Sequence, residues 1–366
     1  MVPYFVMLCV PAMVATFNSL FKSKYKIKNA NRLIVDAFFG IWIVMLVFRN
    51  STLGVDLPVY KQHFFNYSSL TWKDIFSGIF TRKFEATYVL ISKIIGMFTS
   101  DFHWIMVICA LLSVLPIWIL YRKETKHSFL TIVLFVNIAP FAVYFSGLRQ
   151  GIAIAFAVPC YHYCKERKLT KFVITVIIAM ITHSSAFILL AMYPIYHLRI
   201  KKQIYLFLII PLIGVLYVFR LPVFQFLIKL LGNEYIERYS AGIKATGAYS
   251  VTLLLVLLLL FSYLVTDTQK LDKDTIGLRN ILFFSVIIQI FSGVHTLAMR
   301  MNYYYLIFIP LLISKIIDRG QIKYRILLQL SLICMCCFFA FYFFYRIYTG
   351  TDDLGIYPYI SIFSNY

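Results

Sequence analysis

The sequence alternates between long apolar runs and short loops that carry lysine and arginine. Most runs approach the roughly 20 residues that a helix needs to cross a bilayer. A segment surrounded by lipid must satisfy its own peptide hydrogen bonds, and a helix does so within a single run. The pattern therefore predicts an all-α polytopic membrane protein.

The composition supports this class. Of 366 residues, 61% are hydrophobic and only 14% are charged, which leaves too little polar surface for a soluble domain. We therefore expect a single integral membrane domain over residues 1–366. A net charge of +20 would suggest nucleic acid in a soluble protein, but here the basic residues lie mainly in short loops, so we predict no nucleic-acid partner. The seven cysteines show neither zinc nor disulfide spacing, and we predict no metal and no cofactor.

Basic loops mark the cytoplasmic side of a membrane protein. The densest one carries Lys22, Lys24, Lys26, Lys28 and Arg32, and the N-terminal run before it is predicted to be a retained helix. Alternation from this loop predicts about ten spans plus re-entrant or in-plane helices. The predicted spans are Val2–Phe21, Leu33–Phe48, Phe102–Tyr121, Phe129–Phe145, Gly151–Cys164, Ile204–Phe219, Ser250–Val265, Asn280–Thr296, Asn302–Ile317 and Ile326–Tyr345.

Two long segments are predicted to lie outside, residues 49–101 and 220–249. The polar, glycine-bearing part of the second, residues 232–249, is a candidate mobile lid.

The apolar block 172–196 is too short to cross twice, yet basic loops flank it on both sides. Either it spans once against the charge bias, or it consists of two half-helices that break at His183-Ser184-Ser185 and return to the cytoplasmic side. We favour the broken pair, because the later loops fit only that arrangement. Irregular backbone is tolerated at membrane depth where it is buried or lines a wet cavity.

Arg149 and His183 are the ionisable side chains that most need an explanation, since such groups at membrane depth usually face the protein interior or a cavity. Arg149 could instead be an interfacial anchor, and His183 a polar link between helices. Two acids on the outer segment add candidate bases. Asp56 lies on a turn in GVDLPVY, and Glu85 opens an amphipathic helix; a solvated turn residue and a helix-start carboxylate are the alternatives.

Arginines at an outer boundary oppose the usual charge bias and call for a ligand. The topology puts Arg49, Arg149 and Arg300 on that side. A guanidinium binds phosphate oxygens through two parallel hydrogen bonds and stays charged, so a pyrophosphate is a suitable ligand.

The middle of the chain resembles the core of the EpsG family of Wzy-type polysaccharide polymerases. The resemblance lies in the motif SGLRQGIAIAF, the basic loop after it, and the following motif THSSAFILL. GVDLPVY, the acid at Glu85, and Arg300 followed by Tyr303 and Tyr304 extend the resemblance, in order, over most of the chain.

The resemblance implies a GT-C-like glycosyltransferase bundle in the bacterial cytoplasmic (inner) membrane. Such an enzyme joins repeat units carried on undecaprenyl pyrophosphate. A hydroxyl of the acceptor sugar attacks the donor anomeric carbon, and lipid pyrophosphate leaves without help from a metal. The expected partners are the lipid-linked donor and acceptor glycans, the bilayer and a chain-length regulator.

Asp56 is the first choice for the catalytic base, followed by His183 and then Glu85. Arg149 and Arg300 would neutralise the pyrophosphate. The remaining predicted substrate-binding residues are Gln150, Arg49, Tyr60, Ser184, Tyr303 and Tyr304. Two other classes compete with this function: a flippase or transporter of a lipid-linked or anionic solute, which also uses broken helices, and a membrane O-acyltransferase.

Overall fold

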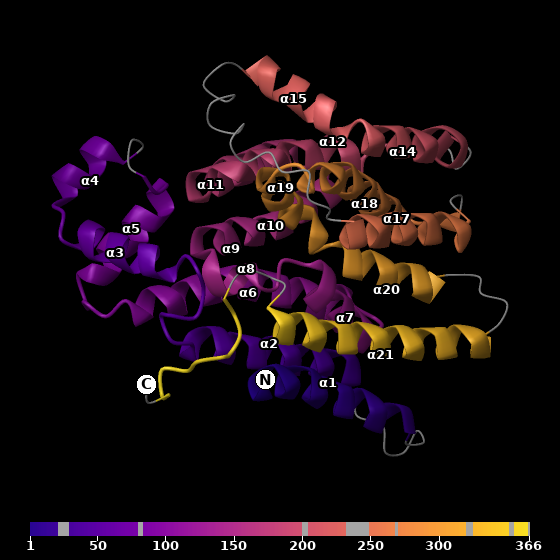
Figure 1. Cartoon of the computed structure of the whole chain (residues 1–366), viewed down its shortest axis with the longest axis horizontal. Coiled ribbons are helices and arrows are strands. Elements are labelled where there is room, and N and C mark those ends of the chain that lie inside the picture. The colour runs from indigo at the N-terminus through magenta and orange to yellow at the C-terminus, as the bar shows by residue number, and fades with distance from the viewer. Residues whose placement is uncertain are drawn as a thin grey trace. The chain divides into compact units, whose positions relative to one another are not determined.

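The computed structural model describes residues 1–20, 29–79, 83–199, 204–231, 249–267, 270–319, 325–350 and 355–364 (Figure 1). These residues form helices joined by short connections. They divide into two compact units, Met1–Phe187 with Tyr324–Tyr366, and Ile188–Lys323.

The first unit contains twelve α-helices among its described residues. They are α1 (Val2–Leu20), α2 (Ala30–Phe48), α3 (Leu57–Ser68), α4 (Trp72–Gly78), α5 (Ala86–Gly96), α6 (His103–Glu124), α7 (Ser128–Ile138), α8 (Val143–Ser146), α9 (Leu148–Ala155), α10 (Ala157–Lys165), α11 (Leu169–Thr182) and α21 (Arg325–Thr349). The 3₁₀ helix η2 (Ser184–Ala191) follows α11.

Long helices form the core of this unit. Helix α2 packs between α1 and α6, and α6 packs on α9. The Trp42 indole of α2 is fully buried, with ring centroids 5.4 Å from Phe135 and 5.2 Å from Phe141. Such offset aromatic contacts add stability beyond burial of area.

The short helices α3 and α5 pack on each other and build a second aromatic cluster. Tyr60, Phe84 and Tyr88 lie within 5.2 Å of one another between ring centroids. Leu148 and Ile152 of α9 belong to the same buried cluster. The predicted outer segment 49–101 is thereby fixed against the first turns of α9.

The loop that precedes α3 is anchored at Gly54. This residue has φ +126°, and a Cβ added to it would lie 2.3 Å from the carbonyl oxygen of Phe145. The backbone N–H of Asp56 then donates to Ser146 Oγ at 3.0 Å. GVDLP and FSGLRQ, which lie about 90 positions apart, are therefore in direct contact.

We expect Gly54→Ala to destabilise the protein by at least about 2 kcal/mol, because it adds backbone strain to a steric clash. The midpoint of thermal unfolding in detergent should fall clearly below that of the wild type. Gly40→Ala in α2 is the matched control, since its new Cβ has no neighbour within 4 Å and alanine favours a helix. Equal midpoints for the two variants would contradict the close packing at Gly54.

The segment 355–364 pairs with the end of α2. Asn50 N–H donates to the carbonyl of Ile360 at 2.8 Å, and Ile362 N–H donates to that of Phe48 at 2.9 Å. Tyr359 Oη donates to Met45 O at 2.9 Å. Tyr4 near the start of α1 bonds the carbonyl of Ile356.

The second unit contains α12 (Met192–Tyr196), the π-helical turn η3 (Tyr205–Ile209), α14 (Ile210–Val218), α15 (Arg220–Leu231), α17 (Tyr249–Leu264), α18 (Lys273–Ser292), α19 (Thr296–Leu306) and α20 (Ile309–Arg319). A buried polar chain joins α18 to α19: Asn302 donates to Gln289 and accepts from Ser285. The Tyr196 hydroxyl and the Lys315 ammonium both bond the Asp274 carboxylate.

Five described helices are long and apolar enough to cross a membrane, and the number rises to seven if two bent pairs each form one span. The single helices are α1, α2, α6, α18 and the part 331–349 of α21. The number, length and composition of these helices are those of a multi-pass membrane protein.

Three predicted spans are interrupted in the structure. Gly151–Cys164 divides at Phe156 into parts of α9 and α10, and Asn302–Ile317 divides after Leu306 into parts of α19 and α20, which are bent by 41°. The third is Phe129–Phe145. Helix α7 ends at Ile138, and Ala139 is extended. Pro140 disfavours helical backbone at the preceding residue and supplies no N–H, so the run Phe129–Phe145 becomes α7 and the short α8.

Lys22 to Lys28 of the basic loop and most of the predicted lid, residues 232–248, lie outside the described residues.

Candidate functional site

Arg149 lies in the first turn of α9, where three groups hold its guanidinium. Nε donates to Tyr60 Oη at 3.2 Å, and Nη1 donates to the Glu85 carboxylate. The guanidinium carbon stacks over the Phe84 ring, 3.8 Å from its centroid. Cation–π contact and charge-assisted hydrogen bonds together define the plane of the guanidinium.

Glu85 immediately precedes α5, and both of its carboxylate oxygens are engaged. One accepts from Arg149 and the other from the Ser184 backbone N–H at 3.0 Å. Burial opposes ionisation of this carboxyl, but the charge of Arg149 and the Ser184 hydrogen bond hold its pKa below the ordinary value. Glu85 is therefore ionised at neutral pH.

The polar triplet His183-Ser184-Ser185 lies at a break in the helical backbone. Helix α11 ends at Thr182, and His183 is extended with φ −157° and ψ 123°. Ser185 approaches His183 Nδ1 through both its hydroxyl, at 3.0 Å, and its N–H, at 3.3 Å. The Thr87 and Thr182 hydroxyls lie 3.0 Å apart. The start of α5 and the end of α11 are thus tied together, which brings Ser184 to Glu85.

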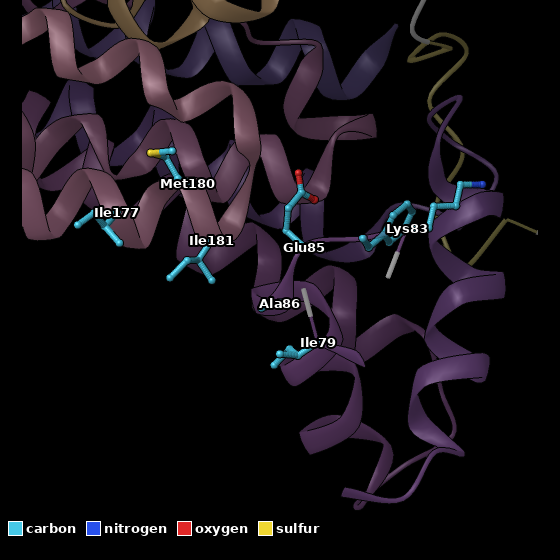
Figure 2. A pocket seen from close by; sticks show the side chains of 8 residues that line it. Ile79, Lys83, Glu85, Ala86, Ile177, Met180 and Ile181 are labelled. Carbon is cyan, nitrogen blue, oxygen red and sulfur yellow. The ribbon is translucent and has the colours of Figure 1, made fainter. Parts of the chain in front are cut away.

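A cavity of about 390 Å³ opens beside this cluster. Its charged lining residues are Lys83 and Glu85. The rest of its lining is apolar: Ile79, Phe84, Ala86, Ile177, Met180 and Ile181. Figure 2 shows the three α11 side chains on one side and Glu85 between them and Lys83. The cavity is therefore amphiphilic: Glu85, which lines it, is bonded to Arg149, whereas the ammonium of Lys83 points away from the α11 side chains in Figure 2.

Asp56 is exposed at the N-terminal end of α3, and its carboxylate makes no capping hydrogen bond there. Burial and, to a smaller extent, the charge of Asp56 raise the pKa of Tyr60, whereas Arg149 lowers it. Asp56 and Arg149 thus both act on Tyr60, whose hydroxyl positions the arginine.

Arg49 and Gln150 are buried. Gln150 is 6% exposed in α9. The Arg49 side chain has no exposed surface; Nη1 donates to Leu46 O at 3.0 Å, while Nε and Nη2 have no hydrogen-bond partner in the described part of the chain. In this conformation Arg49 does not reach solvent.

The other predicted residues belong to the second unit. Arg300 is exposed in α19, whereas Tyr303 and Tyr304 are buried within the unit. His295 caps α19 by accepting from the Leu297 N–H at 2.9 Å.

The structure therefore brings Tyr60, Glu85, Arg149 and Ser184 together, with His183 adjacent in sequence. Sequence reasoning missed Phe84, Lys83 and the apolar wall on α11. Phe84 directly precedes Glu85, but an aromatic residue in an apolar chain carries no distinctive signal. Among the described residues, no group of three His, Cys, Asp or Glu side chains is placed to hold a metal.

Comparison with known proteins assigns the chain at the level of a family. The model of the EpsG family matches residues 32–361, which is nearly the whole chain. No curated protein and no solved structure matches the chain significantly.

Proposed function

The chain belongs to the EpsG family, and on that premise we propose that it polymerises oligosaccharide repeat units carried on undecaprenyl pyrophosphate. The reaction takes place at the outer face of the bacterial cytoplasmic membrane. The family assignment supports a polysaccharide-related membrane protein, and the residues around Arg149 supply the chemistry.

A single observation carries this proposal: a fixed guanidinium lies next to the polar end of an amphiphilic cavity. Arg149 is held by Tyr60 and Phe84, and the adjacent cavity is otherwise lined mainly by isoleucine, methionine and phenylalanine. A lipid pyrophosphate has the matching form, an anionic head joined to a long hydrocarbon. The head would bind at Arg149, and the first isoprene units would contact Ile177, Met180 and Ile181.

In the reaction, a bond forms between the acceptor hydroxyl oxygen and the donor anomeric carbon. The bond from that carbon to the phosphate oxygen breaks, and its electron pair leaves with the pyrophosphate. Arg149 stabilises the charge that develops on the leaving group. Asp56 takes the hydroxyl proton, since it is exposed and its carboxylate is not used as a cap.

His183 is the second choice for the base, with Nδ1 facing Ser185. Glu85 is the third choice, because a carboxylate paired with an arginine is a weak proton acceptor. In the second unit, exposed Arg300 is proposed to bind a phosphate or sugar, and we give buried Tyr303 and Tyr304 the role of supporting its helix.

We also propose that the membrane domain is a GT-C-like bundle with about ten spans. The five to seven candidate spans would be completed by shorter apolar helices, among them Ser128–Ile138, Leu169–Thr182 and Tyr249–Leu264. The surrounding lipids and neighbouring membrane proteins would cover the apolar side chains that these helices expose.

The test is reconstitution of the purified protein with a native lipid-pyrophosphate-linked repeat unit in the presence of EDTA. The proposal expects a ladder of longer glycans that resists the chelator. Unchanged glycan with lipid moved across a liposome bilayer would identify a transporter instead, and an acylated sugar would identify an O-acyltransferase.

We expect Tyr60→Phe to reduce the rate of polymer formation by roughly fivefold, the effect of one lost hydrogen bond of about 1 kcal/mol. The substitution removes the acceptor for Arg149 Nε but keeps the ring that packs on Phe84. Initial rates at saturating donor would measure the effect. Tyr67→Phe, on the same helix and in the same aromatic cluster, is the control and should retain the wild-type rate.

A further inference from the structure

The Glu85 carboxylate occupies the place that a phosphate group would take. Arg149 Nη1 donates to one of its oxygens, and the Ser184 N–H donates to the other. Both donors would serve equally well for two oxygens of a phosphate. We infer that Glu85 is an internal competitor for the anion site, bound when the site is empty, displaced by the incoming lipid pyrophosphate, and returning as the product leaves.

Arg149 does not depend on Glu85 for its position. The Tyr60 hydroxyl holds Nε at 3.2 Å, and the Phe84 ring lies under the guanidinium. These contacts involve neither Nη1 nor the carboxylate. After Glu85 leaves, the guanidinium would keep its plane and present Nη1 to a new anion.

Glu85 is also placed where it can leave. It lies just before α5 rather than within it, and its side chain makes no capping hydrogen bond to that helix. Its side chain is 22% exposed and lines the cavity. In Figure 2 its carboxylate points away from Ile79 and Ala86, the neighbouring parts of the lining. A rotation of this side chain would empty the site without unwinding a helix.

A competing carboxylate suits an enzyme that must release its product. Equal binding of substrate and transition state does not accelerate the chemical step, and tight binding of free pyrophosphate lipid would slow turnover. The carboxylate carries one charge and a pyrophosphate carries more, so the substrate displaces it. When the product leaves, Glu85 pairs with Arg149 again. This matters because an unpaired guanidinium charge in a partly buried site costs free energy.

The identity of the anion rests on the proposed function, but the test does not require polymerisation. Inorganic pyrophosphate is titrated calorimetrically into the full-length protein in detergent. Glu85→Gln should lower the Kd by at least about tenfold, because removal of a competitor that occupies the site most of the time raises the binding-competent fraction. Glu85→Asp, which keeps the charge on a shorter side chain, should give an intermediate Kd.

Glu124→Gln is the matched control, since Glu124 is also ion-paired, to Lys165 at 3.0 Å. It changes the net charge equally and should leave the Kd at the wild-type value. Equal or weaker pyrophosphate binding by Glu85→Gln would overturn the inference and make Glu85 a support for Arg149. Absence of binding in every variant would overturn it as well. A tighter Kd together with no glycan ladder from the wild type would uphold the anion site and reject the polymerase.

Discussion

Arg149→Ala should reduce polymer formation by about 10²–10³-fold, the usual effect of removing one preorganised group that stabilises charge in a transition state. The guanidinium is the group that Tyr60 and Phe84 are arranged to hold, and it pairs with Glu85 when no anion is bound. Incorporation of labelled repeat unit into long glycan would measure the loss.

Arg149→Lys distinguishes charge from geometry. Lysine keeps the positive charge but loses the flat surface that stacks on Phe84 and the second donor that reaches Tyr60. We expect it to remain at least about tenfold below the wild type. Full activity in this variant would rule out two-point recognition of the pyrophosphate.

Arg122→Ala is the matched control for Arg149. Arg122 pairs with Asp36 at 3.0 Å, but its side chain is 55% exposed and lies at the end of α6. Exposed ion pairs contribute little to stability, so this variant should polymerise normally. Thermal unfolding of all three variants would separate lost chemistry from lost folding.

Asp56→Asn should reduce polymer formation by about 10²–10⁴-fold if Asp56 accepts the hydroxyl proton, the range typical of a lost general base. Asparagine matches the shape of the side chain, and the carboxylate makes no capping bond that the change could disturb. The structural contact of this residue is its backbone N–H to Ser146, which the variant retains. Folding should therefore be unaffected.

Asp74→Asn provides the comparison for Asp56. Asp74 lies in the same outer segment, and its carboxylate accepts from Thr71 in a capping box. This variant should lose some stability but keep its polymerising activity. The opposite pattern, with Asp56→Asn fully active, would transfer the base to His183, and His183→Ala would then be the decisive variant.

Hydropathy predicted the long helices well because the length of an apolar run is set by the bilayer. The runs ending at Phe21 and Phe48 correspond to α1 and α2. The run Phe129–Phe145 was wrong as one helix, since Pro140 outweighs hydropathy locally. The EpsG resemblance is confirmed by the family match.

The site was predictable as a set of residues but not as an arrangement. Glu85 and Arg149 each stood out, yet they lie 64 positions apart, and no periodicity specifies a contact at that distance. The Gly54 contact with Phe145 is equally hidden, because a glycine before an acid reads only as a turn. The break that follows α11 could be predicted from the sequence, because three polar residues inside an apolar block disturb a helix locally.

The pairing of segment 355–364 with Phe48 and Asn50 constrains how often the chain crosses the membrane. Two segments that share backbone hydrogen bonds lie on one side, so residues 50 to 360 contain an even number of crossings. The predicted topology has eight spans in that interval besides the block 172–196. A ninth crossing by this block would carry the tail to the opposite side, away from α2. With the eight spans that we propose for that interval, an even total would require the block 172–196 to turn back at His183 rather than pass through.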